Sequence, residues 1–518
     1  MNDNPVIKAA TVAAGASATL LVGMALKYHD RAIFETHNPR TTIQKGYPLI
    51  GSLPDMLREK ENLHDFTDQE FTKYDCMTLS ASALGLPKSV QTIDPANVEH
   101  ILKNNFENYA KGPKFNEATQ DILGHGIFNA NGEQWKWQRK AASLIFNVKN
   151  FRDHFTDVFV DEMGIMCDVL NKAIETKKVV DLHDLMFRYT LDSFVLLGFG
   201  INVKALTHTD KVPFASSFDA LQQHSFDKFV DPFVGMRTSL NKIFKPWVMT
   251  PDKHLKVVDE FCESVIDSRR KQLAAGEEHK DLLSRFMNAR NEHGDKLDDT
   301  ELRDTIMNFI IAGRDTTAQA LSWTFYCLAQ NPRVEEILVK EINDSITDDL
   351  EHNSAALYEK IKDMVYAHAV SSFATDRFHE VLRLYPSVPS NQKYALNDDI
   401  WPDGTPIRKG DYVNWSPYAS ARCEKIWGPD ARQFKPERWL SPDDGSLRRE
   451  SAGKWPAFHA GPRTCLGQNL ATLEALVALS MLLRRYKFTM LPGQNITYGL
   501  SLTLPMKEGF KVLVEKRA

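Results

Sequence analysis

The chain has 518 residues, of which 43% are hydrophobic, and its formal net charge is −5. This length would allow several domains, but it also fits one large enzyme domain with a sizeable core. The acidic balance argues against a protein that binds nucleic acid by bulk electrostatic attraction. Six cysteines at irregular spacings, with no Cys-x-x-Cys pair, argue against a disulfide framework or a zinc site. A reducing compartment fits this cysteine usage best.

An uncharged, apolar segment covers residues 9–26. As a helix it would span roughly 27 Å, close to the ~30 Å hydrocarbon core of a bilayer. Lys8 precedes it and a cluster with three basic groups follows at 27–31, so we interpret it as an uncleaved single-pass anchor. The bulk of the protein would then face the cytoplasm, at the endoplasmic reticulum membrane. The alternative is a cleaved signal peptide, because Ala-Ser-Ala at 16–18 resembles a cleavage site.

Beyond the anchor, a polar hinge leads into a proline- and glycine-containing stretch at 47–54, which stiffens the exit from the membrane. Most windows from about residue 151 to 329 show helical periodicity, whereas short strand-like pieces and turns flank this part. We therefore expect one mainly α-helical domain with a minor β region. The predicted division is anchor and flank at 1–31, hinge at 32–46 and a single domain at 47–518.

Trp135 and Arg139 lie four residues apart in a helical pattern, so they would share one face. Both side chains are hydrogen-bond donors without an acceptor, and together they suit a carboxylate. The alternative is an ordinary basic amphipathic helix.

The longest helical pattern runs from Thr300 to about residue 331, roughly 45 Å. Its apolar sequence is broken by Gly313, Asp315 and Thr316, and such polar groups are costly inside a buried helix unless they are satisfied. Glycine, with a hydroxyl that bonds back to the preceding turn, would open the helix locally and leave a groove. The alternative is a glycine-kinked core helix with a buried ion pair.

Glu380 and Arg383 are three residues apart on one helix face, and Arg438 follows downstream. One Glu and two Arg can satisfy one another when buried, although by spacing alone an ordinary surface pair is the common case.

Near the end of the chain, Cys465 stands between Gly461 and Gly467, behind Phe458 and Arg463. The two glycines would let backbone amides approach the sulfur. The almost wholly apolar run at 470–483 predicts a buried helix whose positive dipole end favours an ionised sulfur. These features predict a thiolate ligand of heme iron, with Arg463 placed to meet a heme propionate. Thiolate ligation favours O–O cleavage, and the chemistry indicated is oxygen activation.

The alternative for Cys465 is a structural cysteine in a Gly-Pro turn. We assign a structural role to the other five cysteines: Cys76, Cys167, Cys262, Cys327 and Cys423.

The five residues around the sulfur match the pattern Phe-x-x-Gly-x-Arg-x-Cys-x-Gly, and from about Tyr47 onward the chain resembles cytochrome P450 monooxygenases. The resemblance implies the cytochrome P450 fold, heme b with Cys465 as the axial iron ligand, O2, and NADPH electrons from a separate reductase. Ala312 replaces a glutamate that some fatty-acid-hydroxylating relatives link to heme, so the heme should be non-covalent.

The resemblance also assigns roles within the site. Thr316 would be the oxygen-binding threonine and Asp315 its acidic neighbour, both delivering protons beside the groove at Gly313. Trp135 and Arg139 would hold a propionate. A buried structural triad would consist of Glu380, Arg383 and Arg438.

The chain departs from the family pattern between His368 and Glu380, which are separated by about seven residues more than expected. The surplus is nearly two helical turns and would keep the same face. A loop bulge or an error in the coding sequence would explain it equally well.

The motifs look most like the plant and fungal fatty-acid ω-hydroxylase branch. We therefore expect a membrane-bound enzyme that hydroxylates a medium- or long-chain fatty acid at or near its ω end. Alternatives are the same chemistry on alkanes, sterols or xenobiotic aromatics, or a heme-binding sensor without turnover.

Overall fold

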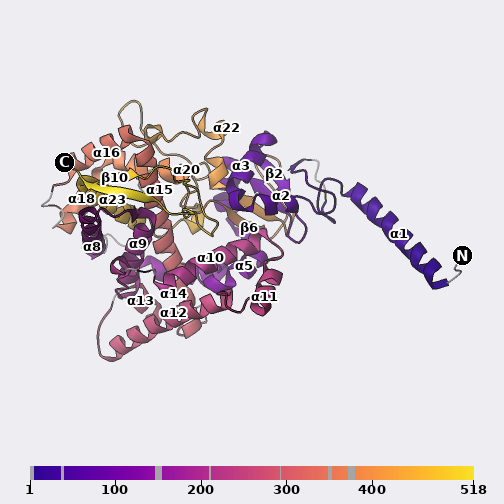
Figure 1. The fold of residues 1–518 in the computed structure, drawn as a ribbon, viewed down its shortest axis with the longest axis horizontal. Helices are drawn as coiled ribbons and strands as arrows, with labels where there is room; N and C mark the ends of the chain where they lie inside the picture. The colour runs from indigo at the N-terminus through magenta and orange to yellow at the C-terminus, as the bar shows by residue number, and fades with distance from the viewer. Residues whose placement is uncertain are drawn as a thin grey trace.

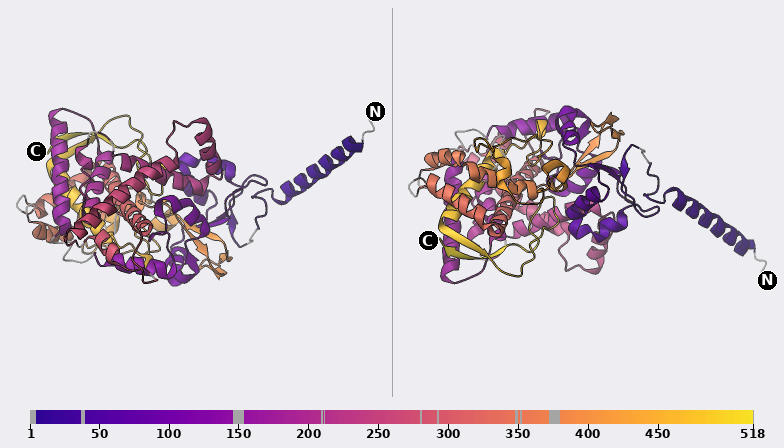
Figure 2. Two further views of the ribbon diagram at one scale, coloured as in Figure 1. Left: turned by 90° about the horizontal axis from the view of Figure 1, so that it is seen from below. Right: turned by 90° about the horizontal axis from the view of Figure 1, so that it is seen from above.

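The computed structural model describes residues 5–36, 40–145, 154–208, 210, 212–279, 281–291, 293–347, 350, 353–371 and 380–517. They form a predominantly helical domain with a small β region, as predicted (Figure 1). The helix α1 (Pro5–Lys27) stands apart and projects alone from one side of the domain (Figure 2). Among the described residues it is the one helix long and apolar enough to cross a membrane, over Ala9–Lys27, and none of that span is buried.

The largest sheet has six strands in the order β1-β2-β3-β9-β6-β4. It joins distant parts of the chain, since Val90 of β3 pairs with Val413 of β9 in parallel, and Lys393 of β6 pairs with Val413 in antiparallel register. Its strands are β1 (Thr42–Ile43), β2 (Thr78–Ala81), β3 (Ser89–Thr92), β4 (Tyr109–Ala110), β6 (Asn391–Ala395) and β9 (Tyr412–Trp415).

Two smaller sheets complete the β region. The order β10-β11-β5 builds a three-stranded sheet near the C-terminus, and a separate hairpin stands beside the large sheet. Their strands are β5 (Val180–Asp181), β10 (Tyr486–Met490) and β11 (Lys511–Lys516), and for the hairpin β7 (Asp399–Ile400) and β8 (Pro406–Ile407).

The helices make up most of the domain and bury one extensive apolar core. In chain order they are α2 (Leu53–Arg58), α3 (Leu63–Lys73), α4 (Pro95–Glu99), α5 (Pro113–Leu123), α6 (Gly132–Ser143), α8 (Thr156–Glu175), α9 (Leu182–Phe199), α10 (Pro213–Val230), α11 (Val234–Phe244), α12 (Pro251–Ala274), α13 (Leu282–Asn288), α14 (Asp299–Ile310), α15 (Thr316–Gln330), α16 (Pro332–Ser345), α18 (Ser354–Asp363), α19 (Val365–Ser371), α20 (Glu380–Leu384), α21 (Pro417–Ser420), α22 (Glu424–Trp427) and α23 (Gln468–Arg485).

The long central helix opens where the sequence predicts. A capping box between Asp298 and Glu301 starts α14, and α15 ends before Asn331. Between them, Ile311–Asp315 forms a π-helical turn, η6, which widens the helix by one residue. Gly313 is required in this turn because a Cβ there would lie 1.9 Å from the Phe194 ring of α9. The prediction of a local opening is confirmed.

The predicted apolar helix behind the cysteine loop is also confirmed. It is α23, whose residues from Thr472 to Leu483 are all buried. The surplus between His368 and Glu380 falls on 372–379, which lie outside the described residues.

Candidate active site

A cavity of about 510 Å³ lies between the central helix, the cysteine loop and the large sheet. It brings together most of the residues that the sequence singles out. Those that line it are Trp135, Arg139, Gly313, Thr316, Phe458, Arg463, Cys465 and Gly467. Asp315, Gly461 and the charged triad do not line it.

The Cys465 sulfur faces this cavity and accepts hydrogen bonds from the backbone N–H groups of Gly467 and Gln468. Burial raises the pKa of the Cys465 thiol, while the Gly467 N–H, the Arg139 guanidinium and the Gln468 N–H act in the opposite direction. The loop therefore presents a sulfur at the start of α23 with amides aimed at it, an arrangement suited to an anionic metal ligand.

Gly461 shapes the loop from behind rather than lining the cavity. Its φ is +61°, and a Cβ would lie 2.2 Å from the Leu102 carbonyl oxygen. Both facts require glycine.

Three basic side chains line one edge of the cavity, Lys111, Arg139 and Arg463, and a fourth, Lys393, lies close to Lys111 and Arg463. Among the described residues, no carboxylate forms an ion pair with any of them. Lys393 is 1% exposed and its Nζ has no hydrogen-bond partner. Burial lowers the pKa of Lys111 to about 7, with Arg463 adding repulsion. Burial and mutual repulsion also lower the pKa of Lys393, and an anionic ligand at this edge would offset both effects and stabilise the charged forms.

Trp135 lies under two of these cations. The guanidinium of Arg463 is 4.6 Å from its ring centroid and that of Arg139 is 5.9 Å away. The two carboxylates of a heme would neutralise this edge, and the thiol lies in the same cavity. The residues present therefore fit a heme.

Sequence reasoning missed Lys111 and Lys393 as members of this cluster. Lys393 did carry a signal, because a lysine at an inward-facing position of a strand is rarely buried without an anionic partner. Lys111 stands in a loop and offered no comparable signal.

Thr316 occupies the wall of the opened helix. Its Oγ1 donates to the Ala312 carbonyl at 2.7 Å, the back-bond predicted for a hydroxyl at this position. The Ser387 hydroxyl donates to the Thr316 carbonyl at 2.9 Å, and the Thr190 hydroxyl donates to the Arg314 carbonyl at 2.9 Å. Neighbouring elements therefore satisfy two carbonyls at the C-terminal end of the opening.

Asp315 faces α10 instead of the cavity. Its carboxylate accepts from Arg314 Nη1 at 2.8 Å and from Gln222 Nε2 at 2.5 Å, while Arg314 also pairs with Asp219 of α10 at 2.7 Å. Burial raises the pKa of Asp315 to about 6, against the opposing effect of Arg314. The buried ion pair of the alternative interpretation is thus present alongside the open groove, and Thr316 alone of the two residues reaches the cavity.

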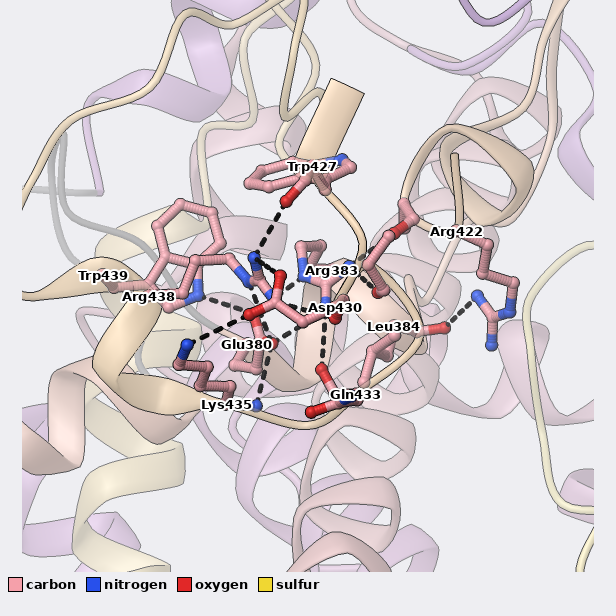
Figure 3. Close-up of polar contacts among 12 residues, drawn as sticks. Glu380, Arg383, Leu384, Arg422, Trp427, Asp430, Gln433, Lys435, Arg438 and Trp439 are labelled. Carbon is pink, nitrogen blue, oxygen red and sulfur yellow. Dashed lines mark hydrogen bonds and ion pairs between the residues drawn. The ribbon is translucent and has the colours of Figure 1, made fainter. Parts of the chain in front are cut away.

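The charged triad is a buried network on α20 and the segment after α22 (Figure 3). Arg383 donates to Glu380 in a bidentate pair, at 2.8 Å from Nε and 2.7 Å from Nη2. Arg438 Nε lies 3.4 Å from the same carboxylate, and Trp439 Nε1 donates to it at 2.8 Å. The remaining Arg383 donors reach backbone carbonyls, including that of Ala431 at 2.6 Å. Since Glu380 and Arg383 are fully buried, the surface-pair interpretation is wrong.

Comparison with known proteins agrees with this geometry. The family model described as Cytochrome P450 matches residues 42–510. The chain is 36% identical to Cytochrome P450 704C1 of Pinus taeda over 493 residues, covering 91% of this chain and 92% of that protein. It is 38% identical to Cytochrome P450 86B1 of Arabidopsis thaliana, covering 83% and 78%. It is 34% identical to Cytochrome P450 monooxygenase cyp1 of Mycosarcoma maydis, covering 94% and 77%. This chain therefore belongs to the cytochrome P450 family of heme-thiolate monooxygenases, which use O2 and electrons supplied by a reductase.

Proposed function

We propose that this protein hydroxylates a medium- or long-chain fatty acid at or near its ω end. The observation that carries the proposal is the reach of the cavity, which extends from the Cys465 sulfur to α2, α3 and β2. Along this path it is lined by apolar side chains such as Leu63, Phe226 and Leu502. A long wall whose surface is mostly apolar accepts an extended acyl chain, with its methyl end at the sulfur.

The motifs of the chain support the same substrate class. Residues 312–317 (Ala-Gly-Arg-Asp-Thr-Thr), residues 380–386 (Glu-Val-Leu-Arg-Leu-Tyr-Pro) and the cysteine loop are similar to those of plant and fungal fatty-acid ω-hydroxylases. The same chemistry on alkanes, sterols or xenobiotic aromatics is the second candidate, since the same apolar wall would accept them.

In this proposal Cys465 ligates the iron, and Trp135, Arg139 and Arg463 hold the propionates. Lys111 and Lys393 add positive charge at the same edge, and the propionate carboxylates would give them anionic partners. Gly313 leaves the groove open, while Phe458, Gly461 and Gly467 shape the loop. Bound heme with a thiolate ligand supplies the activation of O2 for insertion of one oxygen atom into a C–H bond.

Thr316 is the proposed catalytic hydroxyl at the groove. Its proton is held by the Ala312 carbonyl, so its free lone pair can accept a hydrogen bond from a water in the groove and order it for proton transfer. Asp315 lies one residue away with its carboxylate bonded to Gln222 of α10. We propose that it supplies protons from that side, when the contact with α10 opens.

Thr316→Ala should increase hydrogen peroxide release at the expense of product, because the water in the groove loses its partner. Positioned proton-transfer groups contribute on the order of 10²–10⁴ in rate, so product formed per NADPH should fall several-fold or more. The measurement is peroxide and product per NADPH consumed.

Thr324→Ala is the matched control. Thr324 is a buried threonine of the same helix with the same type of back-bond, 2.6 Å to the Ala320 carbonyl, and it does not line the cavity. If the two variants form the same amount of product per NADPH, Thr316 has no role in proton delivery.

For location, we propose a single-pass protein of the endoplasmic reticulum membrane with its catalytic domain in the cytoplasm. The proposed layout is anchor at 1–31, hinge at 32–46 and monooxygenase domain at 47–518. Support comes from α11 and the loop after it, which lie on the half of the domain from which α1 projects (Figures 1 and 2). This surface exposes Ile243 by 70%, Phe244 by 69% and Trp247 by 77%, as a segment in contact with lipid would.

The proposed electron donor is a separate membrane flavoprotein reductase that oxidises NADPH. Microsomes containing this reductase and the protein should convert members of a fatty-acid panel to products hydroxylated at or near the methyl end, detected by mass spectrometry. The same microsomes with alkanes, sterols and aromatics form the comparison. Product from those compounds and none from any fatty acid would overturn the substrate proposal, and absence of NADPH-dependent product from every panel would favour a sensor.

A further inference from the structure

A buried glutamate on α23 has no role in the site described so far. Glu474 is 2% exposed, follows Cys465 by nine residues and borders the cavity. Ser193 Oγ of α9 donates to its Oε1 at 2.5 Å, and the Thr317 side chain of α15 is its second hydrogen-bond partner. Three helices therefore meet at this carboxyl group.

The surroundings keep this carboxyl group neutral. Burial raises the pKa of Glu474 to about 8, and only the two hydroxyls of Ser193 and Thr317 act against it. No cation compensates for a charge on Glu474 among the described residues. With Oε1 accepting from Ser193, the O–H of the protonated acid is left to donate to Thr317, so the neutral group satisfies both partners.

The titratable neighbours are few. Tyr189 of α9 interacts electrostatically with Glu474, and burial raises the pKa of Tyr189 well above 10, so it stays neutral throughout the range of interest. Glu162 of α8 acts on Tyr189 and not on Glu474. From α15 the facing group is Thr317, which does not titrate. A change near pH 8 at this point would therefore belong to Glu474.

The partners of Glu474 connect both sides of the cavity. Its own helix begins directly behind the Cys465 loop, whereas Thr317 follows the catalytic hydroxyl Thr316. The third partner comes from α9, the helix that also bonds to the Arg314 carbonyl through Thr190 and packs against Gly313 through Phe194. Movement of this carboxyl group would shift the first turn of α15, and with it Thr316, relative to the sulfur.

We propose that Glu474 is a positioning residue, which in its protonated form joins α23 to α9 and α15 and so fixes Thr316 relative to Cys465. The proposal rests on the role proposed above for Thr316. When Glu474 ionises, an unneutralised charge appears in an apolar wall and draws water to it. The hydrogen bond that the acid O–H donates to Thr317 is then lost, and the water that solvates the charge competes for both hydroxyls, so control over the groove weakens.

The pH dependence has a defined sign. The folded-state pKa, about 8, lies above the ordinary value of 4.5, so the folded protein binds more protons between these two values. The contribution of protonated Glu474 to the free energy of unfolding is fully present below its ordinary pKa. That contribution is lost as the pH rises through the folded-state pKa. For the wild-type enzyme, the share of electrons released as peroxide should therefore rise as the pH passes about 8.

Two substitutions test the proposal. Glu474→Gln keeps the shape and offers both an acceptor and a donor without titrating. It should therefore hold coupling near the wild-type value at pH 7 and remove the increase in peroxide release above pH 8. Glu474→Leu should release about two- to tenfold more peroxide per NADPH than the wild type at pH 7, the factor expected for one buried hydrogen bond, and its release should not change as the pH passes 8. The thiolate band of the reduced, CO-treated protein should persist in both.

A second measurement requires no substrate. The difference in thermal unfolding temperature between Glu474→Gln and wild type should widen as pH rises from 5 toward 8 and stay constant above that. If Glu474→Leu does not fold, Ser193→Ala breaks the same contact from α9. The proposal is overturned if Glu474→Gln uncouples the enzyme as strongly as Glu474→Leu, or if the unfolding difference does not change with pH. Failure of every fatty acid in the panel, with these patterns intact, would refute the substrate and not this residue.

Discussion

Cys465→Ser should abolish the spectral band that marks a thiolate-ligated heme in the reduced, CO-treated protein, together with all hydroxylation. A serine hydroxyl is neutral at physiological pH and donates far less electron density than a thiolate. Even partners one shell removed from a metal contribute 10–100-fold, so the loss of activity should exceed ~100-fold. The backbone N–H groups of Gly467 and Gln468 would then meet a neutral oxygen in place of the sulfur.

Cys423→Ser is the control for this substitution. Cys423 is half-buried, precedes α22 as its N-cap residue, and lies outside the cavity lining. Serine is favoured at that position, so spectrum and turnover should match the wild type. A Cys465→Ser protein that keeps both the pigment and its turnover would refute the ligand assignment, whatever the control does.

The local features that the structure confirms, the apolar helix behind the cysteine loop and the opening at Gly313, depend on residues that are neighbours both in sequence and in space. One short segment contains Cys465, the backbone amides that bond to its sulfur and the start of α23. The π-helical turn at Gly313 occurs where polar residues interrupt an apolar helix. Such features can be derived from spacing, because backbone geometry over a few residues is nearly fixed.

Several features assembled from distant segments were not predicted. Lys393 approaches Arg463 only because β6 pairs with β9 in the large sheet. Asp315 faces α10 because Gln222 of α10, 93 residues away along the chain, binds its carboxylate. Asp219 of α10 pairs with Arg314, which lies 95 residues further along the chain. Glu474 lies inside an almost wholly apolar run of the sequence. Its proposed role depends on the hydroxyls of Ser193 and Thr317, which belong to other helices. These are tertiary contacts, which no local periodicity encodes.

Glu380→Ala should destabilise the protein by ~3–5 kcal/mol, the range for removing one partner of a buried ion pair. The fully buried guanidinium of Arg383 would lose both of its bidentate bonds, and the Trp439 indole N–H would lose its acceptor (Figure 3). Arg438 would keep Asp430, 2.7 Å away, and so contributes less to the loss. Thermal unfolding and the yield of heme-loaded protein are the measurements, and both should decrease.

Glu437→Ala provides a matched glutamate in the same segment. Its carboxylate pairs with Arg333 at 2.7 Å, but the Arg333 side chain is 64% exposed, and pairs of this type contribute ~0–1 kcal/mol. Similar unfolding temperatures for Glu380→Ala and Glu437→Ala would mean that the buried network adds nothing beyond a surface bridge. Glu380→Gln separates charge from shape, since it retains an acceptor for Trp439 while leaving Arg383 without its counter-ion. It should therefore fall between the two alanine variants, and closer to Glu380→Ala, because the uncompensated guanidinium is the larger penalty.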